Sequence, residues 1–489
     1  PSSMGQPAFA SVRRSSGTAS IRMPIGQGSS QIRTNNTQPQ PREFSEQIRH
    51  KLHNAYYRTY LLGRVNRVIA PYQLETLPLD TPDDDPRWAS YLDLFANAFL
   101  DARGSTEALA AFRKHRRADN AVLGMVTTEG PGLAGRQPVA GFTWAPIGLN
   151  AGAGIVQAMC VNVVAVRPTH RRKGLLRAMM QHHLQQARQD GLALAALTAS
   201  EATIYGRFGF GVASRIVDWE IDIRRFAIRP DATVAAGSLE LVDPPFIKDI
   251  FEHISNSHQR AHRGAFSPLE MHRATADGSW SSAEQGPSRK LRYLVHFDES
   301  GQPDGFAGFS HKGWEEAPSP TEVTAVCSPS PEIDRALWRG LASFDIVERL
   351  TYNSASPDDP LPESLVDSWA VTKKLTHDGV WLRILDMEKA TVERGFESDG
   401  EAVVRVKDPL GFCDGTWQIT VDGGRGAARY TALSPTVELG VDALARLWLG
   451  DATAVQLAQS GTIEGDQDAI AGFSQLFATA IGPANLTHF

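Results

Sequence analysis

The sequence predicts an α/β protein of roughly three domains. The chain has 489 residues, and a single hydrophobic core seldom grows beyond ~250–300 residues. From about residue 86 to residue 388, helical and strand patterns alternate. From about residue 390, short strands come first and helices follow. Alternation is typical of α/β domains, and strands separated from helices are typical of α+β domains.

The composition is that of an ordinary globular protein. Apolar residues make up 42% of the chain and charged residues 21%. The formal net charge of −6 gives no overall signal for nucleic-acid binding. No apolar run approaches the ~18–20 residues that a membrane-spanning helix needs. We therefore expect no nucleic-acid partner and no membrane span.

The cysteines argue against a disulfide framework and a zinc site. Cys160, Cys327 and Cys413 are odd in number, lie far apart, and form no C-x-x-C pair. Such usage fits a reducing compartment, and we expect a cytoplasmic protein.

Two segments precede the first folded domain. Residues 1–42 contain no Asp, Glu or Lys but five arginines, which predicts a disordered tail. An Arg-rich, acid-free organellar transit peptide is the alternative. Residues 43–71 repeat an apolar or aromatic side chain every four residues from Phe44 to Tyr60, which predicts an amphipathic helical extension. We expect its apolar stripe to pack on protein rather than lie on a membrane.

The first folded domain is expected at residues 72–222. A Gly/Pro-rich turn separates its first two strands, and Gly191 ends its longest helix. Its predicted elements are a helix at 88–100, strands at 121–128, 139–145 and 161–166, a helix from 174 to about 190 with Leu176, Met180, Leu184 and Ala187 on its apolar face, a strand at 192–199, a short helix at 200–205 and a further strand.

Two more domains are expected at 223–388 and 389–489. The middle one is predicted to contain helices at 246–263 and 332–343 and strands at 292–297 and 305–310. The last one is predicted to contain strands at 402–406 and 415–421, then helices at 442–449 and 466–480. The middle domain thus repeats the α/β pattern, and the last is a small α+β unit.

Positive charge and a glycine gather between a strand and a helix of the first domain. Arg171, Arg172, Lys173 and Gly174 come directly before the helix. Free backbone N–H groups at a helix start, together with the helix dipole, bind anions such as a pyrophosphate. The segment matches neither the Walker loop nor G-x-G-x-x-G. From spacing alone, a pyrophosphate site and a solvated basic turn are equally good interpretations.

The wider segment carries a resemblance to a known family. Residues 164–179 read VAVRPTHRRKGLLRAM, residues 199–201 read ASE, and residues 204–211 read IYGRFGFG. These runs resemble the cofactor segment and second signature of the enhanced intracellular survival (Eis) family of GCN5-related N-acetyltransferases (GNAT). The general GNAT motif R-x-x-G-x-[GA] ends in Gly or Ala, whereas Leu176 stands here, as it does in the Eis branch.

The resemblance extends from Trp88 to Phe489. DPLP at 359–362, DGVWLRI at 378–384 and the terminal Phe489 also resemble Eis sequences. The resemblance implies tandem GNAT-like domains with mixed sheets, then a small sterol-carrier-protein-like α+β domain. It also implies a homo-hexamer.

The same resemblance implies an N-acyltransferase. It would move an acetyl or other acyl group from acyl-CoA to an amine of a small molecule or peptide by direct attack, with no metal. Tyr205 would be the general acid and the terminal carboxylate of Phe489 the base. The implied cofactor-binding residues are Val164 and Val166 for the pantetheine arm, Arg171, Arg172, Gly174, Leu175 and Leu176 for the pyrophosphate, and Ser200.

Candidate acceptor-binding residues are less sharply indicated. Asp101 and Glu201 could attract a cationic amine, but Asp101 simply follows a helix and Thr198-x-x-Glu201 matches a helix capping box. Ala102 stands where the family has an aromatic residue, and Phe112 is a possible substitute. His258 and His262 are four residues apart, as metal ligands on a helix can be, but no third ligand is evident. We expect them to be solvated.

Two other functions compete. The altered acceptor region is compatible with a longer acyl donor, or with a natural-product or peptide amine as acceptor. A non-catalytic lipid- or CoA-binding protein is the rival from another class, since the last domain resembles sterol carrier proteins. The intact basic turn, Tyr205 and Phe489 favour catalysis. Hydrolysis is disfavoured because neither G-x-S-x-G nor H-E-x-x-H occurs.

Overall fold

The computed structural model describes residues 71–315 and 319–487. The expected tail at 1–42, the extension at 43–71 apart from Pro71, and Phe489 lie outside the described residues. None of the helices in the two described ranges combines the length and the apolar character that crossing a bilayer requires.

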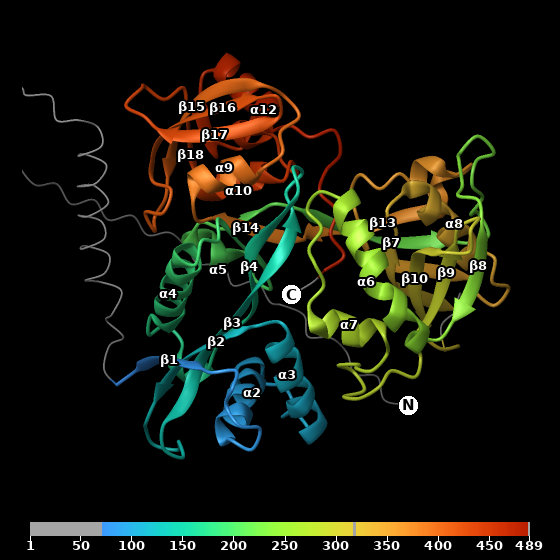
Figure 1. The fold of residues 1–489 in the computed structure, drawn as a ribbon, viewed down its shortest axis with the longest axis horizontal. Helices are drawn as coiled ribbons and strands as arrows, with labels where there is room; N and C mark the ends of the chain where they lie inside the picture. The colour runs from blue at the N-terminus through green and yellow to red at the C-terminus, as the bar shows by residue number, and fades with distance from the viewer. Residues whose placement is uncertain (1–70, 316–318, 488–489) are drawn as a thin grey trace, which may run out of the picture. The chain divides into compact units, whose positions relative to one another are not determined.

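The first sheet has seven strands in the order β1-β2-β3-β4-β5-β14-β6 (Figure 1). Their bounds are β1 Gln73–Leu77, β2 Val122–Thr128, β3 Gln137–Asn150, β4 Ile155–Val166, β5 Leu194–Thr198, β14 Val380–Ile384 and β6 Gly211–Val212. Strands β1 to β4 are antiparallel neighbours, and β5 runs parallel to β4. The four strands expected before residue 200 are confirmed, with β3 and β4 longer than expected because they form one long hairpin.

Helices cover both faces of this sheet. They are α2 (Pro86–Phe99), α3 (Thr106–Ala118), α4 (Leu175–Gln189) and the single turn α5 (Ala202–Tyr205). A Cβ added at Gly141 would meet Leu94 of α2, whereas one added at Gly124 would meet His183 of α4. Gly124 pairs with Phe142, the neighbour of Gly141, and successive residues of a strand face opposite sides. Helices α2 and α4 therefore pack on opposite faces.

Helix α4 has the predicted apolar face. Met180, Leu184 and Ala187 are fully buried, and Leu176 is half-buried. His183 lies on the same face and stacks on Phe142 at a centroid distance of 4.8 Å. Burial lowers the pKa of His183 to about 4, so the ring is neutral at physiological pH and packs as an aromatic side chain.

The second sheet also has seven strands, in the order β13-β7-β12-β11-β10-β9-β8. Their bounds are β13 Val371–Asp378, β7 Arg215–Asp222, β12 Arg349–Ala355, β11 Pro320–Cys327, β10 Pro303–His311, β9 Arg292–Phe297 and β8 Ser238–Val242. The helices of this domain are α6 Pro244–Ala261, α7 Glu270–Ala276 and α8 Pro331–Ala342, with the short turns η3 Pro362–Ser364 and η4 Ser368–Ala370. The expected helices and strands of the middle domain are confirmed to within two residues at each end.

The two sheets exchange strands. β7 follows β6 along the chain but pairs with β12 and β13 of the second sheet. β14 comes after the second sheet along the chain but lies between β5 and β6 of the first. All five residues of β14 are buried. The sheets therefore do not divide at residues 222 and 388, where the sequence suggested domain boundaries.

The last domain is a five-stranded sheet in the order β17-β16-β15-β18-β19 with four helices. The strands are β15 Gly400–Lys407, β16 Gly415–Asp422, β17 Arg425–Tyr430, β18 Val437–Gly440 and β19 Ile463–Gly465; the helices are α9 Met387–Glu393, α10 Val441–Trp448, α11 Ala454–Gln459 and α12 Gln467–Phe477. Helix α10 buries its apolar face against β14 and β6. The predicted fold class of two α/β units followed by an α+β unit is confirmed.

Candidate active site

Strands β4 and β5 part in the middle of the first sheet. Their parallel pairing covers Met159, Cys160 and Val161, opposite Ala195, Ala196 and Leu197, and goes no further. Beyond Val161, β4 pairs with β3 alone among the described strands, through Val164 opposite Phe142 and Val166 opposite Ala140. The edge of β4 that faces β5 therefore offers backbone groups at Val164 and Val166, both half-buried, to an extended ligand arm.

A basic turn leads from β4 into α4. The 3₁₀ turn η1 (Pro168–His170) is followed by Arg172 at φ 63° and Gly174 at φ 80°, two left-handed residues. Gly174 is the N-cap of α4 and makes no side-chain capping bond. A Cβ added to Gly174 would meet no atom within 4 Å, so the space above the helix start is open.

This turn fits the pyrophosphate of a CoA ligand. The N–H groups of Leu175 and Leu176 belong to the uncapped first turn, where they and the helix dipole favour an anion. Arg171, Arg172 and Lys173 are exposed around them. Nη2 of Arg171 donates to the carbonyl of Ala98 at 3.2 Å, which holds its guanidinium group beside the turn.

Tyr205 ends α5 and is 8% exposed. Burial raises the pKa of its hydroxyl above the ordinary value, and the negative charge of Glu201 raises it further. A phenol in this environment keeps its proton at physiological pH. It can therefore donate a proton and cannot serve as a base.

The glycine-rich run after Tyr205 packs against the last domain. A Cβ at Gly211 would lie 2.0 Å from the carbonyl oxygen of Asp442, at the start of α10. Nε of Arg383, on β14, donates to the carbonyl of Phe208 at 2.8 Å. Strand β14 and the start of α10 in the third domain thus together hold the turn that carries Tyr205.

The remaining candidate residues lie at the surface. Glu201 is the N-cap residue of α5 and makes no side-chain capping bond. It therefore does not stand at the third helical position, which a capping box starting at Thr198 would require. Its Oε1 accepts from the Thr203 hydroxyl at 2.9 Å. Ser200 is exposed, as is Asp101, whose Oδ1 accepts from the Ala102 N–H at 2.7 Å. Among the described residues, no hydrogen bond or ion pair joins Asp101 to Glu201.

The end of the described chain returns to the first sheet. The N–H of Phe266 donates to Oδ1 of Asn485 at 3.3 Å, and the Thr487 hydroxyl donates to the carbonyl of Phe266 at 3.2 Å. Phe266 forms a β-bridge with Leu149 at the end of β3. Phe489 itself lies outside the described residues.

Sequence and structure comparisons agree with this architecture. An acetyltransferase (GNAT) domain family matches residues 84–213, a second one matches 272–384, and a sterol carrier protein domain family matches 387–484. The N-acetyltransferase Eis of Mycobacterium tuberculosis is 31% identical over 404 residues, covering 79% of this chain and 93% of that protein. This chain belongs to the Eis family of GNAT enzymes. It is an acyl-CoA-dependent N-acetyltransferase, as the sequence predicted.

Other relatives of this Eis-family chain are more distant or less defined. An uncharacterized N-acetyltransferase of Streptomyces avermitilis is 32% identical over 358 residues, which cover 70% of this chain and 84% of that protein. The crystal structure of Eis1 from Mycobacterium abscessus matches with a TM-score of 0.70 at 23% identity, covering 86% of this chain and 100% of that one. At that identity the match speaks for the fold alone.

The second GNAT domain of the Eis-family chain lacks the basic turn. Helix α8 follows β11 as α4 follows β4, but Ser330 caps it through a bond from the Ile333 N–H to its hydroxyl. Glu332 and Asp334 lie in its first turn. A capped, acidic helix start disfavours phosphate, whereas the uncapped start of α4 in the first domain, with basic residues before it, favours an anion.

His258 and His262 are half-buried and packed on each other, not freely solvated as expected. Their rings stack at 4.2 Å, and Nδ1 of His258 lies 2.9 Å from the carbonyl of Ser328. Burial lowers the pKa of His258 to about 3. The helical spacing placed both rings on one face of α6, which packs toward β10 and β11 rather than toward water. Among the described residues, no group of three His, Cys, Asp or Glu side chains could hold a metal.

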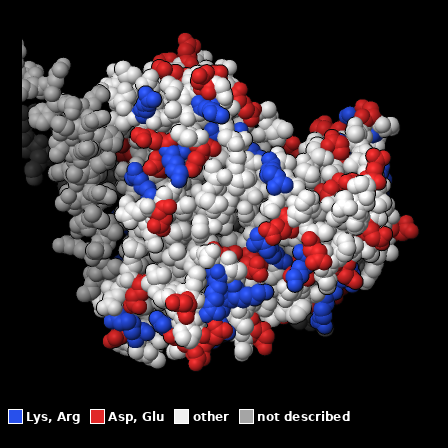
Figure 2. All heavy atoms as spheres, viewed as in Figure 1, with Lys and Arg blue, Asp and Glu red and all other residues white. Residues whose placement is uncertain are grey.

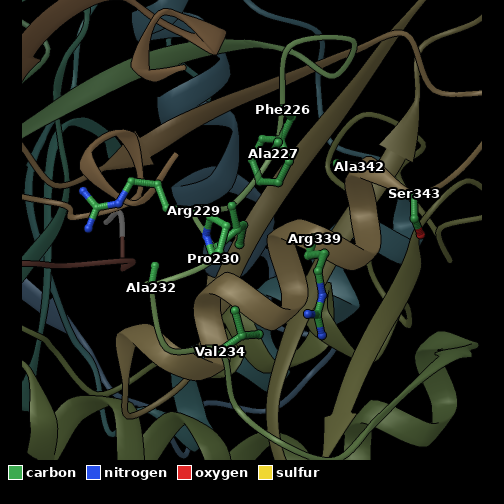
Figure 3. Close-up of a pocket in the computed structure, with 10 residues that line it drawn as sticks. Phe226, Ala227, Arg229, Pro230, Ala232, Val234, Arg339, Ala342 and Ser343 are labelled. Atoms are coloured by element: carbon green, nitrogen blue, oxygen red, sulfur yellow. The ribbon is translucent and has the colours of Figure 1, made fainter. Parts of the chain in front are cut away.

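A pocket of about 460 Å³ lies in the second domain between residues 226–234 and α8 (Figure 3). Figure 3 shows the side chains of Arg229 and Arg339 pointing in different directions. Arg229 is also paired with Asp231 at 3.0 Å. Because the two cations do not converge, this pocket offers no built anion site.

Sequence reasoning missed α3 and the contact that it makes with the centre of the first sheet. The last two turns of α3 carry Arg113, Lys114, Arg116 and Arg117. Lys and Arg gather where α3 lies in Figure 2. Arg116 instead turns inward and donates to Oδ1 of Asn162 in β4 at 3.1 Å. The unusual density of arginine in an amphipathic helix was the one available signal.

Proposed function

We propose that this Eis-family chain transfers an acetyl group from acetyl-CoA to a primary amine of a small molecule or peptide by direct attack. One observation carries the proposal: the parting of β4 from β5, the uncapped start of α4 and the buried Tyr205 all occur in the first domain. Val164 and Val166 would hold the pantetheine arm through their backbone groups. Arg171, Arg172, Gly174, Leu175 and Leu176 would hold the pyrophosphate, with Ser200 as a further contact.

The chemistry requires one proton to leave the amine and one to reach the thiolate. The amine nitrogen bonds to the thioester carbonyl carbon, and the carbon–sulfur bond of the tetrahedral intermediate then breaks. Tyr205 is the proposed general acid, because its raised pKa keeps the proton available for the departing sulfur.

The α-carboxylate of Phe489 is the proposed base. An α-carboxylate has a reference pKa of about 3.3–3.7 and is ionised at neutral pH. The hydrogen bonds that Asn485 and Thr487 make with Phe266 support the proposal, since they tie the chain end to a segment bonded to β3. The phenyl ring would add an apolar anchor.

The acceptor is proposed to be cationic before reaction. Glu201 is one helical turn from Tyr205 and contributes to its electrostatic environment, so its carboxylate can attract an ammonium group. Asp101 would act in the same way from the end of α2. Phe112 packs edge-on to Trp88, with ring centroids 6.4 Å apart. Its ring is thus part of the packing between α2 and α3 and is not proposed as an acceptor contact.

Two further properties are proposed from the family. A closed homo-hexamer is expected, because the likeness to Eis spans all three domains; light scattering at micromolar concentration tests it, and a monomer would contradict it. A cytoplasmic location fits three cysteines that are all free and buried, and cell fractionation tests it.

Mass spectrometry of candidate amines tests the function directly. The enzyme is incubated with acetyl-CoA and with acyl-CoAs of increasing chain length, and each amine is examined for one added acyl group. We expect acetyl transfer to be fastest and to slow by ~10²–10⁴-fold in Tyr205→Phe. If CoA binds but no small-molecule or peptide amine in the panel is acylated, the proposed class of acceptor is contradicted.

A further inference from the structure

The parting of β4 from β5 coincides with a β-bulge. Val161 pairs with Trp144 and Val163 with Thr143, so Asn162 is the extra residue. Asn162 follows Val161, the last residue of β4 that pairs with β5. A bulge twists its strand and redirects the adjacent backbone groups. The geometry of the opening where the thioester is proposed to lie therefore depends on how Asn162 is held.

Asn162 is held by Arg116. Nη1 of Arg116 donates to Oδ1 of Asn162 at 3.1 Å, and Nδ2 of Asn162 lies 3.8 Å from the sulfur of Cys160. On the partner strand, the hydroxyls of Thr143 and Tyr91 are 2.8 Å apart. Helices α2 and α3 thus both reach the bulge through buried polar side chains.

Arg116 is a buried cation without a carboxylate partner. It is 6% exposed, and no carboxylate in residues 71–315 or 319–487 lies within ion-pair distance of it. Its Nε is buried with no hydrogen-bond partner among the described residues. Its guanidinium carbon lies 5.3 Å from the centroid of the Phe112 ring. Burying a charge is costly unless it is paired, so this arrangement is unusual for a side chain that only supports the fold.

The groups around Arg116 compensate its charge only in part. The titratable neighbours are His115 and Asp119 on α3, Tyr91 on α2 and Cys160 on β4, with Glu270 and Arg273 of α7 facing Asp119. Burial raises the pKa of Tyr91 and of Cys160 and lowers that of His115 to about 4, so all three are neutral at physiological pH. The negative charge of Asp119 favours the charged guanidinium, but Asp119 forms no ion pair with it in the described chain, and its Oδ1 accepts from the N–H of Glu270 at 2.8 Å.

We propose that Arg116 is a positioning residue for acyl transfer: through Asn162 it fixes the bulge at the β4–β5 opening, and its charge stabilises the oxyanion that forms there. The proposal rests on the proposed location of the thioester in this opening. In a buried site, a fixed positive charge is worth far more than in water. The same charge disfavours the ammonium form of a bound acceptor and so favours the neutral amine that attacks.

Three variants separate charge, geometry and fold. Arg116→Met keeps the side-chain volume and removes the charge. Arg116→Lys keeps the charge but lacks the planar guanidinium group. Asn162→Leu removes the acceptor of the hydrogen bond. Arg113→Met is the matched control, since it removes a charge from the same helix. Nε of Arg113 lies 3.7 Å from Asp83, away from the bulge. Circular dichroism and thermal unfolding identify any variant that fails to fold.

Single-turnover acyl transfer over a range of pH provides the readout. In the wild type, the rate should rise with pH as the bound ammonium loses its proton. For Arg116→Met we expect a rate ~10–100-fold lower at the plateau and a shift of the apparent pKa upward by about one unit. Arg116→Lys should retain most of the pKa effect. Asn162→Leu should lower the rate, and combining it with Arg116→Met should cost less than the product of the two single losses.

Calorimetry with CoA distinguishes this role from cofactor binding. Wild type, Arg116→Met and Arg113→Met should all bind CoA equally, because the pyrophosphate turn is untouched. Loss of CoA binding in Arg116→Met would overturn the proposal and make Arg116 part of the cofactor site. A folded Arg116→Met with the wild-type rate, or with a lower rate but an unshifted pH profile, would overturn it as well.

Discussion

Arg383 and Asp408 form a fully buried ion pair in which Nη2 of the arginine donates to both carboxylate oxygens at 2.7 Å. Arg383 lies on β14 in the first sheet, and Asp408 follows β15 in the third domain. The carboxylate also accepts from the N–H groups of Leu410 and Cys413. Because Nε of Arg383 donates to Phe208, the pair links the third domain to the turn that carries Tyr205.

Breaking this pair should destabilise the enzyme strongly. Asp408→Ala leaves the Arg383 charge buried and unpaired, which typically costs ~3–5 kcal/mol. The urea midpoint followed by tryptophan fluorescence measures the effect. The double variant Arg383→Leu, Asp408→Leu should lose less stability than Asp408→Ala. A single variant within ~1 kcal/mol of wild type would show that the pair contributes little.

The basic turn should control acyl-CoA affinity rather than turnover. Replacing Arg171 and Arg172 together with Ala should raise the KM for acetyl-CoA more than it lowers kcat, because phosphate contacts contribute uniform binding. Gly174→Ala should also raise KM, since φ 80° is strained by ~1–2 kcal/mol for a residue with a side chain. Arg188→Ala, a change in the last turn of α4 and far along the chain from the basic turn, is the control and should leave KM unchanged. An unchanged KM in the double variant would remove the pyrophosphate from this turn.

Tyr205→Phe should lower kcat by ~10²–10⁴-fold while acetyl-CoA affinity is preserved, because only the transferable proton is lost. Activity should fall as pH rises through the Tyr205 pKa, since an acid works only while protonated. Glu201→Gln should move that alkaline limb to lower pH, because the Glu201 charge raises the Tyr205 pKa. Steady-state kinetics with both variants provide the check, and near-normal kcat in Tyr205→Phe would make the tyrosine structural.

The terminal carboxylate can be tested without altering a side chain. A short C-terminal tag moves the carboxylate away from Phe489 and should abolish turnover, whereas Phe489→Ala keeps the carboxylate but loosens it and should cause an intermediate loss. Acetyl-CoA affinity measured by calorimetry should change little in either. Normal kcat in the tagged enzyme would place the base elsewhere, with Glu201 the next candidate.

Stability should depend on the ionisation of Asp334. Burial raises its pKa to about 7 in the folded state, against ~3.9 for an unfolded chain. The folded protein therefore binds more protons between these values, and the contribution of Asp334 to stability falls as pH rises through that range. Asp334→Asn should make the free energy of unfolding fall less steeply with pH. Between pH 5 and pH 8 the variant should gain about 2–4 kcal/mol of unfolding free energy relative to wild type. Buried Asp359, whose pKa is raised to about 6, should leave part of the slope. Urea midpoints at the two pH values measure it, and parallel pH curves for the two proteins would contradict it.

Local patterns predicted much of the fold. Helix α4 and strand β5 followed from apolar periodicity and from Gly191, which ends the helix with φ 84°. β14 was noticed as a motif, but its place between β5 and β6 was not predictable, since it depends on pairing across a whole intervening domain. Helix α3 was missed because its arginines hide its apolar stripe.

The cofactor turn was predictable because its residues are contiguous in the sequence. The contact between Arg116 and Asn162 was not, since 46 positions separate the two residues and neither belongs to a motif. For His258 and His262, the local spacing was informative but the tertiary environment was not predictable. Their spacing gave the shared helix face, but the strands that bury that face come later in the chain.

The placement of β14 sets the order in which the first sheet can form during synthesis. A ribosome adding ~5–20 residues per second completes β5 and β6 long before it reaches β14. Until then the nascent first sheet has a gap between two apolar strands, and the turn that carries Tyr205 lacks its anchor on Arg383. The active site can therefore be completed only after the middle domain has been synthesised. A gene fragment that stops at Val212 encodes a chain in which the strand edges that pair with β14 are unpaired, and such edges promote aggregation.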